Sequence, residues 1–179
     1  MANAWKPPPK LKLSEWAEKY LYLSPEDSSE PGRYNPSRAP YQRWILDMFS
    51  DESVEECGLM SSSQIGKTLL LKAYIGYCIH LKPGAIGLYT STLTLAKKFS
   101  KDRLAPMIRD TPVLRDRISP HKSRSGGNTL LHKNFLGGQL TIAGANSPSS
   151  LASQPLRDVL IDELDRMNID VGGEGDPRQ

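Results

Sequence analysis

The chain is poor in residues that form disulfides or bind transition metals. It has two cysteines and three histidines among 179 residues. Cys57 and Cys78 do not have the spacing of metal ligands, so we expect both to be small buried side chains in a reducing compartment. The histidines are scattered and have no acidic or cysteine partner at a useful spacing. We therefore assign none of them a catalytic role.

Long apolar runs and a strong charge of either sign are also missing. No uninterrupted apolar stretch reaches membrane-spanning length, and residues 1–9 lack the apolar run of a signal peptide, so we expect a cytosolic protein without membrane contact. The net charge of +3 produces no global field that would indicate nucleic-acid binding. With 38% hydrophobic residues, the chain is expected to form one α/β unit with a buried core.

A phosphate-binding loop is the strongest motif that is present. Residues 57–60 form a short apolar run that predicts a strand, and residues 69–81 form a helix-like run. Between the two runs lie Ser61, Ser62, Ser63, Gln64, Ile65, Gly66, Lys67 and Thr68. In such a loop, backbone N–H groups wrap a polyphosphate, the lysine ammonium reaches the outer phosphates, and the threonine hydroxyl ligates Mg²⁺. The order of these features predicts that the chain binds a nucleoside triphosphate.

The loop departs from the full pattern at one position. The pattern has glycine five residues before Gly66, whereas this chain has Ser61. An ordinary turn between a strand and a helix is therefore the alternative interpretation. The strand and the helix expected on either side favour a nucleotide site.

A second motif is an apolar strand that ends in two carboxylates, Asp162 and Glu163. In a parallel sheet such a strand is buried on both faces, and its carboxyl end opens into the ligand crevice. Asp162 would then hold the Mg²⁺ shell, and Glu163 would polarise the water that attacks the γ-phosphoryl group. The alternative is a solvated acidic turn, because Asp165 and Arg166 follow directly.

The other segments predict helices, a loop and a hairpin. Helical spacing predicts a docking helix over residues 11–21 and a second helix over 41–49, in which Gln42 could be a surface residue. Prolines predict an extended arm over residues 24–40. We expect the next strand over Ala85 to Thr90, and a hairpin from residues 129–135 and 139–143 closed by Gly137-Gly138.

Basic residues are concentrated on one face of a predicted helix that starts near Leu93. Lys97, Lys98, Lys101 and Arg103 lie on this face, and the apolar positions lie on the other. The face could contact a phosphate backbone, or it could be an ordinary solvated surface. Because aromatic side chains that would stack on single strands are nearly absent, we expect any nucleic acid here to be duplex.

Six motifs, in register over the whole chain, resemble the large terminase subunit of tailed bacteriophages, in its lambda-like GpA-type branch. They are Ser14-Glu-Trp-Ala; Pro31-Gly32 with Ala39-Pro-Tyr-Gln-Arg; Ser61 to Thr68; Gly144-Ala-Asn-Ser-Pro-Ser-Ser-Leu; Leu160-Ile-Asp-Glu-Leu-Asp-Arg; and Gly173-Glu-Gly-Asp-Pro. The resemblance implies a P-loop ATPase with a three-layer fold and a mostly parallel sheet. It also implies an ATP-driven motor that packages double-stranded DNA into a procapsid, acting in the host cytoplasm.

The resemblance assigns roles to individual residues. Gln42 matches the family's adenine-recognising glutamine, and Lys67 and Thr68 match the phosphate and magnesium residues. Asp162 and Glu163 match the metal-associated acid and the catalytic acid. Residues 92–104 resemble the segment that faces DNA in related translocases.

The resemblance also implies a domain division and partners. Residues 1–40 would form the docking helix and arm, and residues 41–179 the N-terminal part of the ATPase domain. The expected partners are duplex DNA, the terminase small subunit, the portal protein and further copies of the large subunit in a ring.

Two departures from the family pattern matter. Many terminases carry an arginine where this chain has Ser63, and a neighbouring subunit is expected to supply the missing cation. Arg157 lies five residues before Asp162, about 16 Å away along a strand, so we interpret it as structural. The chain also stops before the strand that follows the acidic strand, and it lacks the coupling motif and the nuclease domain. We therefore predict neither DNA cleavage nor autonomous packaging by this polypeptide.

Two other functions remain open. One is a helicase-like ATPase that uses the same loop and acid pair. The other is a non-hydrolysing assembly or DNA-binding module in which the altered loop no longer holds nucleotide.

Overall fold

The computed structural model describes residues 10–62, 64–118, 128–145 and 155–167. Its main sheet has four strands in the order β4-β5-β3-β6, namely β4 (His132–Phe135), β5 (Gly138–Gly144), β3 (Ala85–Thr90) and β6 (Asp158–Ile161). The central strand β3 pairs in parallel with both β5 and β6, whereas β4 and β5 are antiparallel. The predicted α/β fold with a mostly parallel sheet is therefore confirmed.

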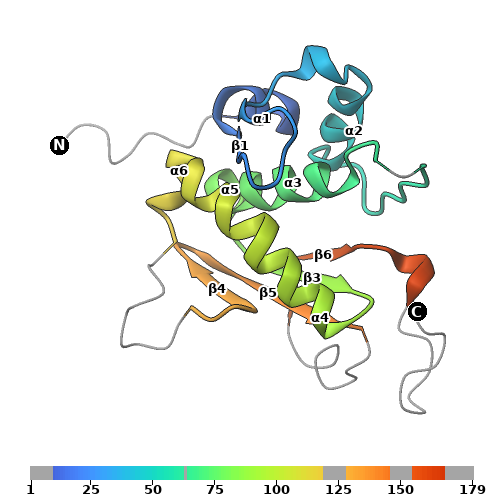
Figure 1. The fold of residues 1–179 in the computed structure, drawn as a ribbon, viewed down its shortest axis with the longest axis vertical. Helices are drawn as coiled ribbons and strands as arrows, with labels where there is room; N and C mark the ends of the chain where they lie inside the picture. Colours follow the sequence, from blue (N-terminus) through green and yellow to red (C-terminus); the bar gives the residue numbers. More distant parts are fainter. Residues whose placement is uncertain (1–9, 63, 119–127, 146–154, 168–179) are drawn as a thin grey trace.

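The described helices lie along one side of this sheet (Figure 1). They are α1 (Leu13–Tyr20), α2 (Tyr41–Phe49), α3 (Lys67–Leu81), α4 (Leu93–Lys98), η2 (Phe99–Leu104), α5 (Ala105–Asp110) and α6 (Pro112–Arg115). Two short helical turns, η1 (Pro36–Arg38) and η3 (Leu164–Arg166), and a two-stranded ribbon of β1 (Tyr22–Leu23) with β2 (Gly32–Arg33) complete the described elements. No helix among the described residues is long and apolar enough to cross a membrane.

The main core lies between the sheet and α3. Ile86 and Leu88 on β3 and Leu140 and Ile142 on β5 alternate toward the helices, as expected for a strand with a period of two. A smaller cluster that includes Tyr89 occupies the other face. The apolar run predicted to be a buried helix therefore supplies the centre of the fold, and α3 is covered on its second side by α1 and α2.

The predicted docking helix forms and packs on α3 through Trp16. This indole is fully buried, and its Nε1–H donates a hydrogen bond of 2.9 Å to Nδ1 of His80. Gly76 on α3 makes room for the ring, because a Cβ there would lie 2.5 Å from the Trp16 Cη2 atom. Trp16 therefore joins α1 to α3, which are far apart in the sequence, and glycine at position 76 leaves the space for its ring.

The hairpin and the helix from Leu93 form with small differences from the prediction. Phe135 pairs with Gly138, so the turn residues are Leu136 and Gly137, and Gly137 has the positive φ of 83° that favours glycine. The helical stretch from Leu93 to Asp110 contains a six-residue π-helical segment, η2, between α4 and α5.

The strand predicted over residues 57–60 does not form. These residues have no regular secondary structure, Met60 is 99% exposed, and Cys57 is exposed rather than buried as expected. A strand needs a neighbour to satisfy its backbone groups, and no described strand lies beside this segment. The expectation for Cys78 is confirmed, since it is buried on α3.

Among the described strands, β6 lies at an edge of the sheet. One of its faces is partly exposed, so the prediction that both of its faces are buried is also wrong. Val159 is 55% exposed and Ile161 is 40% exposed. A groove of about 590 Å³ runs between β6 and the segment after α2, with Phe49, Val54 and Leu160 in its wall. Cys57, at the start of the unformed strand, lines the same groove as Val159, Leu160 and Ile161 of β6.

We predict that the open edge makes the chain self-associate, because an exposed apolar edge strand is a template for pairing with another chain. The double variant Val159→Lys and Ile161→Lys should raise the concentration at which oligomers appear several-fold in sedimentation velocity experiments. Leu136→Lys is the matched control, since Leu136 is exposed at the hairpin turn, away from the edge. Equal behaviour of the two variants would contradict an edge-driven contact.

Candidate functional site

The predicted phosphate loop leads directly into the first turn of α3. Gly66 is the residue before the helix and has φ of +90°, in the left-handed region. A Cβ at Gly66 would lie 2.5 Å from Nε2 of Gln42. Both the backbone conformation and the close contact therefore require glycine at this position.

The carbonyl of Ile65, one residue earlier, is held by two side chains of α2. The Tyr41 hydroxyl donates a hydrogen bond of 2.9 Å to it, and Nε2 of Gln42 donates one of 3.1 Å. Oε1 of Gln42 in turn accepts a hydrogen bond of 3.1 Å from the Tyr34 hydroxyl. Burial raises the pKa of Tyr34, which keeps this hydroxyl protonated as a donor. This chain of contacts fixes the last peptide of the loop before Gly66.

Gln42 is therefore not a surface residue. It is only 4% exposed, and both its carbonyl oxygen and its amide nitrogen have partners within the protein. The structure places Gln42 against the loop, where its amide nitrogen donates to the carbonyl of Ile65. Tyr41 is half exposed beside it.

Lys67 lies over the loop that precedes it. Its Nζ donates hydrogen bonds of 3.2 Å to the carbonyl of Ser61 and 3.0 Å to that of Ser62. Among the described residues, no side chain caps the N-terminus of α3, where the backbone N–H groups of Lys67 and Thr68 lie. An ammonium group and N–H groups at a helix N-terminus together favour an anion. Ser63 lies outside the described residues.

The acid pair follows β6 at the same end of the sheet. The backbone N–H of Asp162 donates a hydrogen bond of 2.9 Å to the carbonyl of Tyr89, which continues the parallel pairing of β6 with β3. Burial raises the pKa of Asp162, and the neighbouring Glu163 raises it further, whereas the charge of Lys67 opposes this shift. The structure thus brings Lys67 and Asp162 within electrostatic reach of each other, although they are far apart in sequence.

Backbone strain is found in both motifs. Within the described ranges, the only residues other than glycine with positive φ are Gln64 in the loop, at 63°, and Glu163, at 55°. This conformation costs an ordinary residue roughly 1–2 kcal/mol. Such strain persists where the surrounding structure imposes it, and it concentrates at functional sites. Glu163 also forms an ion pair of 3.2 Å with Arg166 through its Oε2 atom.

A magnesium site made of protein groups alone is absent from the described part of the chain. No three His, Cys, Asp or Glu side chains there are grouped so that they could hold a metal ion. Mg²⁺ is commonly held by one or two protein oxygens together with substrate phosphates and water. Asp162, with its half-buried carboxylate, and Thr68, in the first turn of α3, fit that mode of binding.

Arg157 has the structural role expected for it. Its guanidinium donates to the carbonyl of Pro83 at 2.7 Å, to the carbonyl of Lys82, and to the carboxylate of Asp158. It therefore ties the start of β6 to the turn after α3, at the opposite end of the strand from Asp162.

Sequence reasoning missed two groups near this site. Tyr34, which holds Gln42, lies in the proline-rich arm, where no pattern marks it. Asp27, in the same arm, contacts Lys72 of α3 and Arg103 of η2. Lys72 itself was a usable signal, because a lysine in an almost wholly apolar helix needs a buried acidic partner.

Comparison with known proteins identifies the relatives of this chain. Residues 28–179 match the family of the phage terminase large subunit gpA, ATPase domain. The chain is 29% identical over 171 residues to the terminase large subunit of Enterobacteria phage P21, covering 95% of this chain and 26% of that protein. It is 25% identical over 178 residues to the terminase large subunit of Escherichia phage lambda, covering 99% of this chain and 27% of that protein. The chain therefore spans about a quarter of the length of both relatives.

Replacing Glu163 tests the backbone strain. We predict that Glu163→Gly unfolds at higher denaturant than Glu163→Ala, with a difference of about 1 kcal/mol, because glycine adopts a positive φ without a Cβ clash. Asp165→Gly and Asp165→Ala are the control pair, since Asp165 lies in η3 and alanine should be the more stable there. If alanine were the more stable residue at both positions, the strain at Glu163 would be refuted.

In the ligand-free chain, ionisation of Asp162 should lower the stability of the folded state. Its pKa is raised in the folded state, so the folded chain holds this proton more tightly than the unfolded chain, and stability falls as pH rises through the interval between the two values. We predict that Asp162→Asn has a higher Tm than the parent at pH 7, and that this gain shrinks as pH falls toward 3.5. Asp165→Asn, at an exposed carboxylate, is the control. A Tm gain that did not depend on pH would contradict the assignment.

Proposed function

Because the chain belongs to the phage terminase large subunit gpA ATPase-domain family, we propose that it binds ATP with Mg²⁺ and hydrolyses it to drive the packaging of double-stranded viral DNA. The observation that best supports this proposal is the position of the two motifs. Lys67 lies at the start of α3 and Asp162 follows the end of β6, and the nearby charge of Lys67 counteracts the rise in the pKa of Asp162 that burial causes. Ligands of open α/β sheets bind at this carboxyl end of the strands.

The proposed binding mode uses the groups of the loop. Backbone N–H groups from Gly66 to Thr68 would face the phosphates, and Lys67 would exchange its hydrogen bonds to Ser61 and Ser62 for phosphate oxygens. Thr68 and Asp162 would hold Mg²⁺, which neutralises charge on the phosphate oxygens when it is bound. The contacts of Tyr41 and Gln42 with Ile65 would keep the loop in place, and the adenine contact proposed for Gln42 would be made at its edge.

Glu163 is the proposed general base. Its carboxylate would accept a proton from the water that attacks the γ-phosphoryl group. In the described structure Oε2 of Glu163 pairs with Arg166, and this ion pair would hold the carboxylate in one orientation.

A positive charge to stabilise the transition state is proposed to come from a neighbouring subunit. Ser63 stands where many terminases have an arginine, and an arginine finger contributes about 10³ to 10⁵ in rate. The isolated chain would then hydrolyse ATP slowly, and a ring of subunits would be faster. The proposed partners of the motor are the small subunit and the portal protein, and its proposed location is the host cytoplasm.

The open edge of β6 bears on the proposed domain division. Residues 41–179 would form part of the ATPase domain, and residues 1–40 would form the docking segment. We propose that the groove beside Val159 and Ile161 receives the further strand of the family's sheet. That strand would also give residues 57–60 the neighbour that they lack.

Two variants test the proposed chemistry. Lys67→Ala should weaken ATP binding about tenfold or more, since a charged hydrogen bond contributes about 1.5–3 kcal/mol. Glu163→Gln should bind ATP as the parent does and lose about 10² to 10⁴ in turnover, the range for general base catalysis. Binding is measured by titration calorimetry with Mg²⁺, and turnover by phosphate release.

Lys10→Ala is the matched control, because Lys10 is exposed and lies outside the helices and strands. If Lys67→Ala bound ATP as tightly as the control, the loop would not be the nucleotide site, and the non-hydrolysing module would be the better interpretation. Equal turnover in Glu163→Gln and the parent would remove Glu163 from the mechanism.

A further inference from the structure

The carboxylate of Asp27 is shared by two cations from different elements. The Asp27 side chain is only 1% exposed, its Oδ1 accepts a hydrogen bond of 2.7 Å from the guanidinium of Arg103, and its Oδ2 contacts the ammonium of Lys72. Asp27 belongs to the arm after α1, Lys72 to α3 and Arg103 to η2. One buried acid thus links three parts of the chain. They are the N-terminal arm, helix α3 after the phosphate loop, and the segment η2, which carries Arg103.

Lys72 depends on this acid more than Arg103 does. Its side chain is 6% exposed, whereas that of Arg103 is 45% exposed. Burial and the neighbouring Arg103 charge lower the pKa of Lys72 to about 8, so the ammonium is still charged at neutral pH and needs a partner. Lys72 and Lys67 lie on the same helix, so α3 connects this ion pair to the loop.

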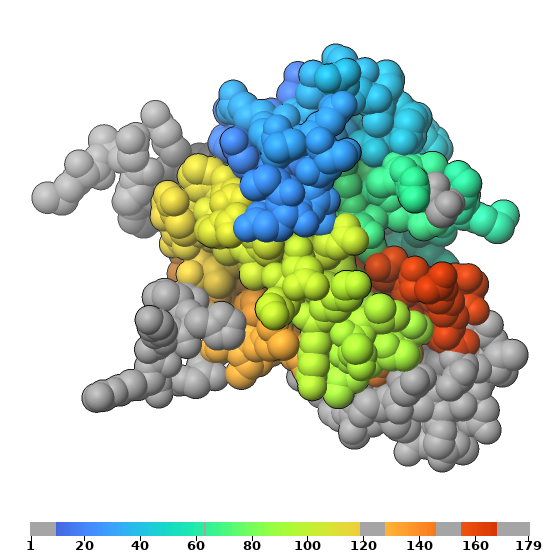
Figure 2. All heavy atoms as spheres, viewed as in Figure 1, coloured from blue at the N-terminus to red at the C-terminus, as the bar shows by residue number. Residues whose placement is uncertain are grey.

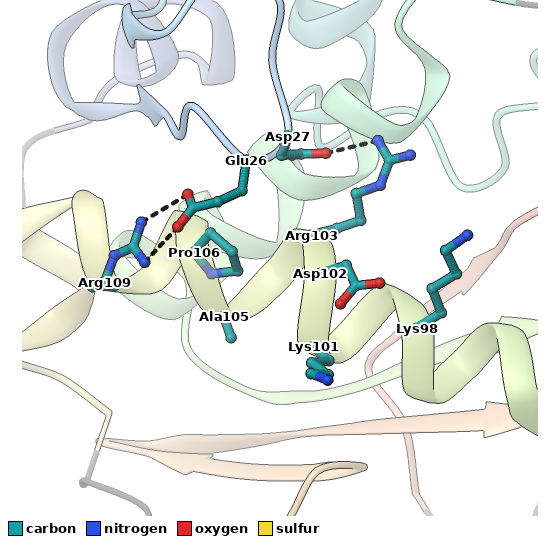
Figure 3. Close-up of a pocket in the computed structure, with 9 residues that line it drawn as sticks. All are labelled: Glu26, Asp27, Lys98, Lys101, Asp102, Arg103, Ala105, Pro106 and Arg109. Atoms are coloured by element: carbon teal, nitrogen blue, oxygen red, sulfur yellow. Dashed lines mark hydrogen bonds and ion pairs between the residues drawn. The ribbon is translucent and has the colours of Figure 1, made fainter.

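A charged hollow of about 610 Å³ opens beside Arg103. Figure 3 shows Lys98, Lys101 and Arg103 along one helical stretch, with Asp27 and Glu26 above them. Within the described part of the chain, Lys98 and Lys101 have no ion pair, whereas Arg109 at the far end is paired with Glu26 and Asp110. Asp102 also lines the hollow. Figure 2 shows this stretch at the surface of the molecule, next to the N-terminal segment.

The chemistry of the hollow fits a phosphodiester of duplex DNA. Two unpaired ammonium groups and an exposed guanidinium can contact backbone phosphates, and the residues that line the hollow include no aromatic ring for base stacking. The π-helical segment η2 places Arg103 there, and π-helical turns are frequent at functional sites.

We propose that a DNA phosphate bound in this hollow competes with Asp27 for Arg103, and that Asp27 thereby reports DNA contact to α3 through Lys72. The proposal deepens the proposed function and rests on it. When the phosphate binds Arg103, the ion pair between Arg103 and Asp27 is broken and the ion pair between Asp27 and Lys72 remains. The electrostatic interactions that position α3 therefore change. Because the coupling is reciprocal, nucleotide bound at the loop changes DNA affinity by the same factor as DNA changes nucleotide affinity.

The first experiment measures binding of a short DNA duplex without nucleotide, by fluorescence anisotropy over a range of salt. The double variant Lys98→Ala and Lys101→Ala should lower the slope of log affinity against log salt by up to about 2, because each lost phosphate contact lowers it by roughly 1. The control is Lys10→Ala with Arg115→Ala, which removes two exposed cations that neither line the hollow nor lie in residues 92–104. Equal slopes for the two double variants would overturn the phosphate site.

The second experiment tests the competition. Arg103→Gln should weaken DNA binding, whereas Asp27→Asn should strengthen it several-fold, because the competing carboxylate is gone. Since Asp27→Asn leaves Lys72 buried without an anion, Asp27→Asn combined with Lys72→Met provides a variant without that charge, and thermal unfolding checks that each variant is folded. Weaker DNA binding by both folded Asp27 variants would overturn the proposal.

The third experiment tests the link to α3 and separates this inference from the proposed function. DNA should change the affinity of the parent for ATP, and this change should be lost in the Asp27→Asn, Lys72→Met variant while ATP binding without DNA remains. Loss of DNA binding alone would leave the ATP site untouched, and failure of the ATP site would appear in the Lys67→Ala test. An unaltered DNA effect in the Asp27→Asn, Lys72→Met variant would refute the role of Asp27.

Discussion

The parallel pairing of β6 with β3 is the constraint on which the candidate site depends. The hydrogen bond from the N–H of Asp162 to the carbonyl of Tyr89 continues this pairing past the end of β6. It sets where the acid pair leaves the sheet, and α3, packed on the same sheet, sets where Lys67 begins. A slip of one residue in β6 would turn Asp162 to the other face and separate it from Lys67.

The packed core stabilises a site whose backbone strain and buried charge are themselves unfavourable in free energy. Gln64 and Glu163 have strained backbones, and burial disfavours the charge on Asp162. Fully buried side chains such as Leu70, Ile86 and Leu88 pack in the core and stabilise the helix and the central strand next to these motifs. Strain and desolvation in a site with a rigid frame are typical of groups that are held ready for a ligand.

Buried charge also connects this site to the rest of the chain. Lys72 lies in an otherwise apolar stretch of α3 and is matched by Asp27 from an arm that forms little regular structure. A buried ion pair contributes little net stability compared with apolar packing, but loss of one partner is strongly destabilising. The position of the arm on α3 and η2 is therefore well defined, although short-range patterns predict only an extended segment there.

The sequence by itself determined the helices, the central strand, the hairpin and the order of the two motifs, because these depend on local periodicity and on turn residues such as Gly137. Only the tertiary structure decided that residues 57–60 remain without a strand and that β6 lies at an edge, because strand formation requires a neighbour that no local pattern reveals. It also decided that Gln42 and Asp27 are buried. Their partners, Ile65, Lys72 and Arg103, are more than twenty residues away, and only folding brings such groups into contact.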